Sequence, residues 1–308
     1  MFSNRFLFRS FFFKRNKFAD APNVIREVGN VTKDSYSVPD HIQKPPYYHI
    51  LNKQASTVGN IEIKNEKQIE GMRRSCRLAA RILNMCQDVV KPGTTTDEID
   101  KFLFNKIIAS NAYPSPFKYC GFPKSICTSV NNIACHGIPD DRALMDGDII
   151  NIDITVFFKG FHGDTSRTFL VGNVNKPGRY LVEHNQKALM KAIGICGPGK
   201  CFNEIGREIS NYAKEVKLSN VRAFIGHGIG DFFHGPPEIY HFENTINMEL
   251  MQPGMTFTIE PIFSEGSNEL ELWEDKWTTS TIDGSRTSQF EHTILITDNG
   301  CEILTVDD

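Results

Sequence analysis

Residues 146–173 read DGDIINIDITVFFKGFHGDTSRTFLVGN, and this stretch decides the fold. Between 148 and 158 apolar and polar positions alternate with the period of two that is typical of a β-strand. One face of that strand carries isoleucines, and the other carries the polar side chains Asn151, Asp153 and Thr155. An acidic side chain on a strand that is otherwise apolar costs several kcal/mol if it is buried without a partner, so Asp153 is the first sign of a site.

The second half of this stretch returns as a hairpin. If Phe158 pairs with Phe161, Ser166 lies opposite Asp153, and Asp164 lies on the same face one diagonal step away. Diagonal neighbours in a sheet are about 7–8 Å apart, so two carboxylates at these positions can share ions. A bulge in the returning strand would change this register.

The C-terminal half of the chain repeats the arrangement. The runs 255–263 and 290–297 are apolar and strand-like, and each carries one acidic residue, Glu260 and Glu291. They follow a histidine set between glycines, His227 in GHGIG. Each half therefore contributes one acidic pair, which indicates a pseudo-symmetric molecule.

Each of these five residues also has a plainer interpretation. The aspartates fit turn or edge positions, His227 fits a turn, Glu260 before Pro261 fits the end of a strand, and Glu291 fits a solvent-facing position. Their conjunction favours convergence, because four buried carboxylates repel one another and stay partly protonated unless cations neutralise them. Two ions about 3.5–4 Å apart also lower the pKa of a bridging water from 15.7 toward about 7, which supplies a hydrolytic reaction.

Length and composition are those of a globular protein. The chain has 308 residues, of which 40% are hydrophobic and 11% aromatic, enough for one large core or two moderate ones. None of the eight cysteines lies in a CxxC pair. This argues against a zinc finger or a disulfide framework and favours reduced thiols inside a cell. No run of about 20 apolar residues is present, so we expect no transmembrane helix.

The N-terminus differs from the rest of the chain. Residues 1–19, MFSNRFLFRSFFFKRNKFA, contain five basic residues and no acidic one, which is typical of a mitochondrial targeting segment. Arg9 interrupts the apolar run that a secretory signal would need, and the alternative is an untargeted tail. Removing this segment changes the formal charge from −3 to −8, since 34 minus 5 basic residues then face 37 acidic ones. Neither value indicates nucleic-acid binding.

Helical patterns alternate with the strands. Residues 20–60 are interrupted by prolines and read as an extension that wraps or links, before a domain spanning 61–308. Thr95 and Glu98 have the spacing of a capping box. Helical periodicity is found over residues 66–90, 95–110, 178–195 and 201–215. Two helices followed by strands, twice over, predict an α+β fold with helices packed on one face of a mostly antiparallel sheet.

Five phrases together resemble the motifs of type I methionine aminopeptidases of peptidase family M24. The likeness covers about residues 43–305, and with the basic leader it is closest to the mitochondrial form. It implies the pita-bread fold, two pseudo-symmetric halves around a dinuclear metal site. The phrases are NAYPSPFKYCGFPKSICTSVNNIACHGIPDD (111–141), DGDIINIDITVFFKGFHGDTSRTFLVGN (146–173), FIGHGIGDFFHGPPEI (224–239), GMTFTIEPIF (254–263) and SQFEHTILIT (288–297).

The resemblance also implies a ligand set for two divalent ions per chain. Asp153 would hold one ion as a bidentate ligand, and His227 with Glu260 would hold the other. Asp164 and Glu291 would bridge both ions. Carboxylates with one imidazole accept Co, Mn, Fe or Zn, so the identity of the metal stays open.

Substrate-binding and catalytic residues follow from the same motifs. His136 would contact the substrate at the scissile amide, and His234 would bind its carbonyl oxygen. Glu260 would accept the proton of the attacking water and pass it to the leaving amine, aided by His136. Thr155 is expected to orient a ligating carboxylate or a water. The apolar pocket for the methionine side chain would be lined by Tyr119, Phe122, Cys127, Phe233 and Trp277.

The implied activity is hydrolytic removal of the N-terminal (initiator) methionine from polypeptides with a small second residue. In the mitochondrial matrix another enzyme would first have to remove a formyl group. We expect a monomer whose partners are polypeptide N-termini that start with methionine. Two alternatives stay open: a proline-specific aminopeptidase or dipeptidase of the same fold, which usually has a large extra N-terminal domain, and a non-catalytic binding relative, which would be expected to lose ligands.

Overall fold

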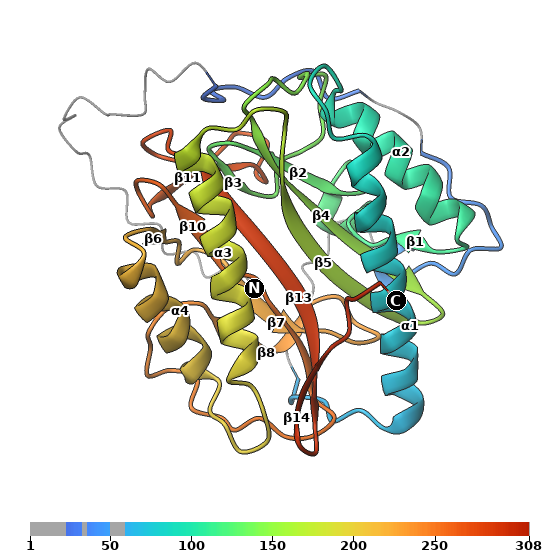
Figure 1. Ribbon diagram of the computed structural model, residues 1–308. Coiled ribbons are helices and arrows are strands. Elements are labelled where there is room, and N and C mark those ends of the chain that lie inside the picture. Colours follow the sequence, from blue (N-terminus) through green and yellow to red (C-terminus); the bar gives the residue numbers. More distant parts are fainter. Residues whose placement is uncertain (1–22, 33–35, 50–58, 308) are drawn as a thin grey trace.

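The computed structural model describes residues 23–32, 36–49 and 59–307, so the predicted targeting segment 1–19 lies outside the described residues. All four predicted helices are present in it, within a few residues of their expected ends (Figure 1). The first ends earlier than expected and continues as a 3-10 turn. The helices are η1 (Pro46–His49), α1 (Glu66–Asn84), η2 (Met85–Asp88), α2 (Thr96–Ala109), η3 (Tyr119–Gly121), α3 (Lys176–Gly194) and α4 (Asn203–Glu215).

The strands form one large sheet and one small sheet, and every pair among the described strands is antiparallel. The main path of the large sheet runs β1-β4-β5-β13-β9-β7-β8, with β2 beside β4 and with β10 and β14 beside β13. The strands are β1 (Tyr113–Pro114), β2 (Cys127–Val130), β3 (Ile133–Cys135), β4 (Ile149–Phe158), β5 (Phe161–Leu170), β6 (Ser219–Asn220), β7 (Ile225–Gly228), β8 (Gly235–Tyr240), β9 (Thr256–Ile259), β10 (Ile262–Ser264), β11 (Leu270–Leu272), β12 (Thr279–Thr281), β13 (Thr287–Thr297) and β14 (Gly300–Ile303).

The hairpin β4–β5 has the register that its sequence predicts. Phe158 pairs with Phe161 across the tip, and Asp153 pairs with Ser166. The pairing continues without a bulge through Gly163, which lies opposite Val156. A tight hairpin tip therefore fixes which side chains of the two strands share a face.

Helix α1 packs very close to β5 because of a glycine. A Cβ atom on Gly163 would lie 2.5 Å from the backbone carbonyl carbon of Ser75 in α1, closer than real contacts allow. The hydroxyl of Ser75 donates to the carbonyl oxygens of Phe158 and Phe161, at 2.9 Å each. Helix α1 therefore contacts the hairpin tip directly, and its closest approach is at Gly163, the residue before Asp164.

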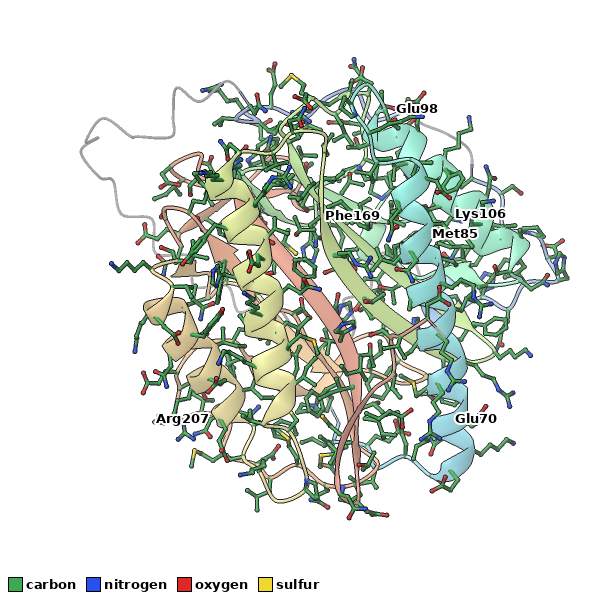
Figure 2. All side chains as sticks on the ribbon, viewed as in Figure 1. Glu70, Met85, Glu98, Lys106, Phe169 and Arg207 are labelled. Atoms are coloured by element: carbon green, nitrogen blue, oxygen red, sulfur yellow. The ribbon has the colours of Figure 1, made fainter. Side chains whose placement is uncertain are left out.

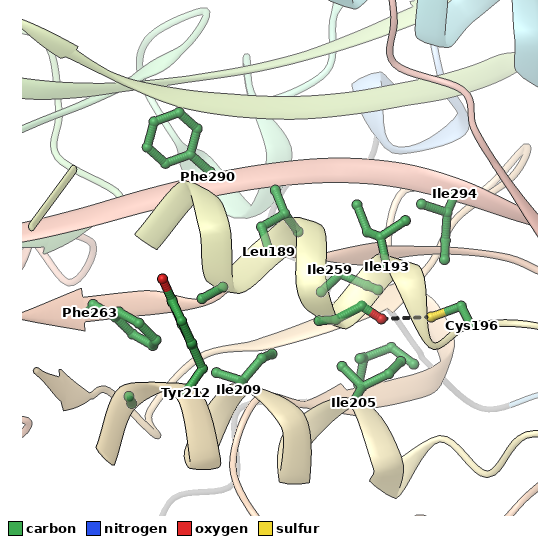
Figure 3. Packing of buried hydrophobic residues seen from close by; sticks show 14 of the residues in the cluster. Leu189, Ile193, Cys196, Ile205, Ile209, Tyr212, Ile259, Phe263, Phe290 and Ile294 are labelled. Carbon is green, nitrogen blue, oxygen red and sulfur yellow. Dashed lines mark hydrogen bonds between the residues drawn. The ribbon is translucent and has the colours of Figure 1, made fainter. Parts of the chain in front are cut away.

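Two large apolar cores lie between the helices and the sheet. One joins α1 and α2 to β4 and includes Leu103 and Ile152, both fully buried. The other joins α3 and α4 to β9 and β13 and includes Leu189, Ile205 and Phe290 (Figure 3). In each half of the molecule, helices pack through an apolar core on one face of the sheet and hold the strands of that half in place.

Polar side chains cap helix ends and cover the outer surface of the molecule. The capping box predicted at Thr95 and Glu98 is present. Charged residues such as Lys106 on α2 and Arg207 on α4 lie at the outer edge of the molecule (Figure 2). No helix of the described part combines the length and apolar character that a bilayer crossing requires.

One expected strand is interrupted. The run 255–263 forms β9 and β10, with Glu260 and Pro261 between them, so the expectation of one continuous strand was wrong. Pro261 has no N–H for the ladder, and the N–H of Glu260 donates to Nε2 of His241 at 3.0 Å. The break frees Glu260 from regular pairing with its neighbours.

The contact at Gly163 gives a stability prediction. Gly163→Ala should lower the free energy of unfolding by about 1–3 kcal/mol, because the new methyl group forces α1 away from β5. Urea unfolding of the purified protein measures this. Gly194→Ala is the control, since a Cβ there meets nothing within 4 Å. Equal stability of the two variants would contradict the packing argument.

Candidate metal centre

Four strands place one side chain each in a single row across the sheet. Cys127 of β2 lies opposite Asp153 of β4, Asp153 lies opposite Ser166 of β5, and Ser166 lies opposite Glu291 of β13. Residues directly opposite one another point to the same face of a sheet. The small side chain of Ser166 therefore separates two carboxylates and leaves space above itself.

The next row along the same face carries a third carboxylate. Asp164 of β5 lies opposite Thr155 of β4. The hydroxyl of Thr155 donates to Oδ1 of Asp164 at 2.7 Å, so Thr155 orients a carboxylate as the sequence predicts. On the other side, the hydroxyl of Thr293 donates to the backbone carbonyl of Asp164 at 2.8 Å.

Side chains from both halves of the molecule meet above these rows. One ligand atom each from Asp164, His227 and Glu291 lies within 4.8 Å of the other two. Nε2 of His227 is 3.7 Å from Oδ2 of Asp164 and 3.8 Å from Oε1 of Glu260. These separations are too long for hydrogen bonds, but they suit donor atoms arranged around an ion.

Asp153 and Glu260 lie at the margin of this group of three. The negative charge of Asp153 acts on Asp164, Glu260 and Glu291, because it raises the pKa of each of them. Its Oδ1 atom is buried and accepts no hydrogen bond from any described residue. A buried carboxylate oxygen without a donor is costly, and a cation is the group that would satisfy it.

Burial makes the four carboxylates hard to ionise without a cation. It raises the pKa of Asp153 to about 7 and the pKa of Glu260 to about 8. The pKa values of Asp164 and Glu291 lie well above their usual range, first through burial and then through the neighbouring carboxylates. Burial also lowers the pKa of His227 to about 4, which keeps its imidazole neutral, the form that binds metals. This donor set fits a divalent metal centre.

Three residues that sequence reasoning missed hold Glu260 in place. The hydroxyl of Thr258 donates to Oε1 of Glu260 at 2.8 Å, and Nε2 of Gln289 donates to Oε2 at 3.3 Å. Thr258 also accepts from the backbone N–H of His227 at 3.0 Å. His241 is buried and accepts the N–H of Glu260. Thr258 lies two positions before Glu260, so strand periodicity could have identified it.

The two predicted catalytic histidines have different neighbours. His234 lies beside His227, at 4.2 Å between ring centroids, and His136 lies beside Trp277, at 5.9 Å. His136 has a left-handed backbone with φ 55°, and a Cβ on the next residue, Gly137, would lie 2.1 Å from the carbonyl oxygen of Thr128. The backbone thus turns sharply here, which is a strained arrangement often found at functional sites. Nδ1 of His234 is hydrogen-bonded to the hydroxyl of Tyr119 at 2.9 Å. Burial lowers the pKa of both imidazoles, that of His136 to about 4.

The predicted pocket residues fall into two connected groups. Phe122 and Cys127 pack with Trp277, whose ring centroid is 5.1 Å from that of Phe122. Tyr119 and Phe233 form the other group, with ring centroids 4.8 Å apart. The backbone N–H of Phe122 donates to the carbonyl of Tyr119, which joins the two groups. The backbone of residues 119–122 therefore links the two groups.

Comparison with known proteins identifies the family. The model of metallopeptidase family M24 matches residues 70–298. The chain belongs to this family. Among curated relatives, methionine aminopeptidase 1D, mitochondrial, of Danio rerio is 50% identical over 297 residues, 96% of this chain and 86% of that protein. The protein of the same name in Homo sapiens is 50% identical over 272 residues, 88% of this chain and 80% of that protein.

Solved structures of M24 enzymes confirm the pita-bread fold. The crystal structure of methionine aminopeptidase from Rickettsia prowazekii matches with a TM-score of 0.79 and 43% identity, over 80% of this chain and 100% of that one. Prolidase from Pyrococcus furiosus matches with a TM-score of 0.63 and 22% identity, over 80% of this chain and 66% of that one. The second likeness concerns the fold alone. The expected α+β class with helices on an antiparallel sheet is therefore confirmed.

The raised pKa values of the carboxylates predict how metal and pH act on stability. In the unfolded chain these groups lose their protons near pH 4, whereas in the metal-free folded protein Asp153 and Glu260 hold theirs to about pH 7 and 8. The folded state then binds more protons, so its stability falls as pH rises through this window.

Thermal unfolding in a chelating buffer should therefore show a midpoint that decreases from about pH 7 to pH 8. Below this range buried neutral histidines such as His136 and His227 act in the opposite direction, because they gain protons on unfolding. Added Mn²⁺ should raise the midpoint more at pH 8 than at pH 5.5, since binding must displace those protons. Asp153→Asn removes one of these carboxyl groups, so it should make the metal-free decrease shallower. A metal effect of equal size at both pH values would contradict the assignment of the carboxylates as ligands.

Proposed function

We propose that this M24 metallopeptidase is a methionine aminopeptidase that removes the N-terminal methionine from polypeptides with a small second residue. The observation that carries the proposal is the meeting of Asp164, His227 and Glu291, with Asp153 and Glu260 beside them. The same chain shares half of its residues with proteins named methionine aminopeptidase over most of its length.

Asp153, Asp164, His227, Glu260 and Glu291 would hold two divalent cations, with Asp164 and Glu291 shared between them. Their oxygen-rich donor set accepts Co, Mn, Fe or Zn. When bound, such cations polarise a carbonyl group and lower the pKa of water toward neutrality. This supplies the attacking group for hydrolysis of a peptide bond.

Glu260 is the residue in this site best suited to move a proton. Thr258 and Gln289 each bind one of its oxygens, so its orientation is fixed. A carboxylate held in a fixed orientation can act first as a general base and then as a general acid. Glu260 would therefore take a proton from water and return it to the leaving amine.

His234 and His136 would bind the peptide on either side of the bond that breaks. His234 is neutral, and Tyr119 occupies its Nδ1 atom, which leaves Nε2 for the substrate carbonyl. His136 lies next to the ring of Trp277, at 5.9 Å between centroids, and faces the pocket from the other wall. A donor that is already in position stabilises negative charge on the carbonyl oxygen without reorganisation.

The pocket selects methionine by its shape and by the polarizability of its thioether. Phe122, Cys127 and Trp277 offer an apolar wall, and burial with the nearby Asp153 charge raises the pKa of the Cys127 thiol. This thiol therefore stays neutral and behaves as a small apolar group. A thioether makes favourable contacts with aromatic rings, which suits a methionine side chain better than a proline ring.

We place this activity in mitochondria. The relatives from Danio rerio and Homo sapiens are named mitochondrial, and the acid-free basic segment 1–19 is of the targeting type. Substrates there would be polypeptides whose formyl group another enzyme has already removed. Import into isolated mitochondria, followed by N-terminal sequencing of the mature chain, tests both the location and the processing site.

Peptide cleavage separates this function from its rivals. The metal-loaded protein should release methionine from Met-Ala-Ser, leave formyl-Met-Ala-Ser intact, and cleave Ala-Pro at least about 100-fold more slowly, the size of preference that one pocket can give. Chromatography of the products measures all three. Faster cleavage of Ala-Pro would favour a proline-specific peptidase, and no cleavage of either would favour a non-catalytic relative.

Asp164→Asn tests the metal centre itself. The change keeps size and the hydrogen bond with Thr155 but removes one shared negative charge. It should lower kcat/KM for Met-Ala-Ser by well over tenfold, more than about 1.4 kcal/mol, while the circular dichroism of the folded protein stays the same. Asp298→Asn, at an exposed turn, is the control and should match the parent enzyme. Activity within tenfold of the parent would count against the proposal.

A further inference from the structure

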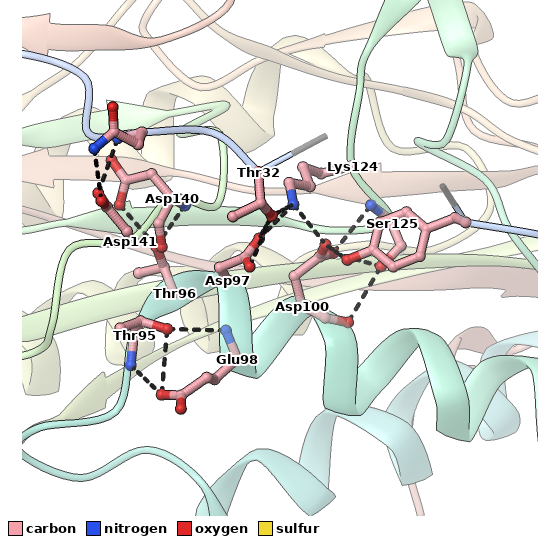
Figure 4. A network of polar contacts seen from close by, with 12 residues as sticks. Thr32, Thr95, Thr96, Asp97, Glu98, Asp100, Lys124, Ser125, Asp140 and Asp141 are labelled. Carbon is pink, nitrogen blue, oxygen red and sulfur yellow. Dashed lines mark hydrogen bonds and ion pairs between the residues drawn. The ribbon is translucent and has the colours of Figure 1, made fainter. Parts of the chain in front are cut away.

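The part of the chain before the M24 domain crosses the domain surface and is bound to it at several points. We call residues 23–32 and 36–49 the extension. The backbone and side chain of Asn30 both donate to the carboxylate of Asp141, each at 2.8 Å. Thr32 donates to the carboxylate of Asp97, which also pairs with Lys124 (Figure 4). The extension thus has a defined position on the domain.

Tyr47, near the C-terminal end of the extension, is inserted behind the active site. Its hydroxyl donates to the backbone carbonyl of Ser115 at 2.6 Å. Its ring centroid lies 5.0 Å from that of Tyr119, edge to face, and 6.2 Å from that of His162, nearly parallel. Ser115 also hydrogen-bonds to Nδ1 of His162 through its hydroxyl, at 2.8 Å. One extension side chain therefore touches three residues of the domain interior.

Those contacts lead directly to the predicted catalytic histidine. His162 is stacked on Phe233, with ring centroids 5.2 Å apart and planes 8° apart. Phe233 lies 4.1 Å from the ring of His234, and the hydroxyl of Tyr119 binds Nδ1 of His234. Rings packed in this way have few alternative positions, because each one fills the space beside the next. Tyr47 packs against two members of this group of rings, Tyr119 and His162.

A second extension residue lies behind the opposite wall of the pocket. Val31 packs against the group formed by Phe122, Cys127 and Ile138, which Trp277 also joins. The two contacts of the extension are therefore on the two groups of residues that form the methionine pocket. Val31 and Tyr47 are far apart within the extension. The extension therefore contacts the pocket residues at two separate points along its course.

We propose that the extension is a working part of the substrate pocket, and that Tyr47 is a positioning residue that holds Tyr119 and His162 behind His234. This inference rests on the proposed methionine aminopeptidase function. In this proposal, residues before the part of the chain that matches the family model contribute to the wall that carries His234. Errors of about 1 Å in the position of a substrate-binding group can cost about 100-fold in rate, so loss of the Tyr47 ring should affect catalysis and not stability alone.

The neighbouring tyrosine provides a matched control. Tyr48 follows Tyr47 in the same 3-10 helix, and its ring packs edge to face on Tyr113, at 5.6 Å between centroids. Among the described residues, the partners of its ring are His49, Tyr113, Lys44 and Lys118, and none of them belongs to the stack of Tyr119, His162 and Phe233. Replacing Tyr48 with alanine removes the same atoms from the same helix without opening a space behind His234.

The test compares Tyr47→Ala, Tyr47→Phe and Tyr48→Ala in the full-length, Mn²⁺-loaded enzyme with Met-Ala-Ser as substrate. Per folded, metal-loaded molecule, Tyr47→Ala should lower kcat/KM by about 10- to 100-fold, mostly through kcat, because His234 loses its support. Tyr47→Phe keeps the ring and should stay within about threefold of the parent enzyme, as should Tyr48→Ala, since neither opens the stack.

A second measurement does not depend on activity. In the metal-free protein, hydrogen exchange of the backbone amides over residues 230–235 should be faster in Tyr47→Ala than in Tyr48→Ala. If Tyr47→Ala does not fold, Tyr47→Leu replaces it in both measurements. Equal kcat/KM and equal exchange in the Tyr47 and Tyr48 variants would overturn the inference. An inactive parent enzyme would instead count against the proposed function, while the exchange result would still decide whether Tyr47 supports this segment.

Discussion

Four carboxylates and one imidazole must be buried together on one face of the sheet, and the rest of the structure depends on this constraint. Burial raises the pKa of Asp153 to about 7, and burial together with the Asp153 charge raises that of Glu260 to about 8, so the group is costly to assemble. The surrounding residues reduce the cost. Thr155 and Thr258 each donate to one carboxylate, and small Ser166 separates two others within one row. A site of this kind exists only where regular strands hold each charge at a fixed distance from the next.

Strand β13 joins the two halves of the molecule. This strand pairs with β5 of the first half and with β9 and β10 of the second, so Glu291 stands where the halves meet. The helices supply the other side of each half, since α1 packs on β4 and β5 and α3 packs on β13 (Figure 1). Their apolar cores fix the strands from the face opposite the charges. The close contact of Gly163 with α1 keeps Asp164 in register with both halves.

Local pattern was enough to predict much of this arrangement. The tip at Phe158 and Phe161 gave the register of β4 and β5, and with it the shared face of Asp153 and Asp164, because side chains in strands alternate strictly. At Glu260 the pattern allowed a strand through residue 263 or a strand end before Pro261, and the structure has the second, because proline interrupts a ladder. The contacts of His241 and Tyr47 could not be predicted, because they join segments whose sequences carry no signal of one another. The extension was expected to wrap or link, and its sequence does not show which pocket residues it would touch.

The late position of β13 in the chain determines when the candidate metal centre can form during synthesis and folding. Glu291 meets Ser166 across more than 120 residues of intervening chain, as a strand of residues 287–297 near the C-terminus. Contacts of such high sequence separation form only after the entropy of a long loop has been lost, and they cannot form at all before the last strand has left the ribosome. A growing chain therefore lacks Glu291, one of the four carboxylates that meet at the candidate metal centre. This centre is complete only after β13 has paired with β5, one of the last steps in which the sheet can form.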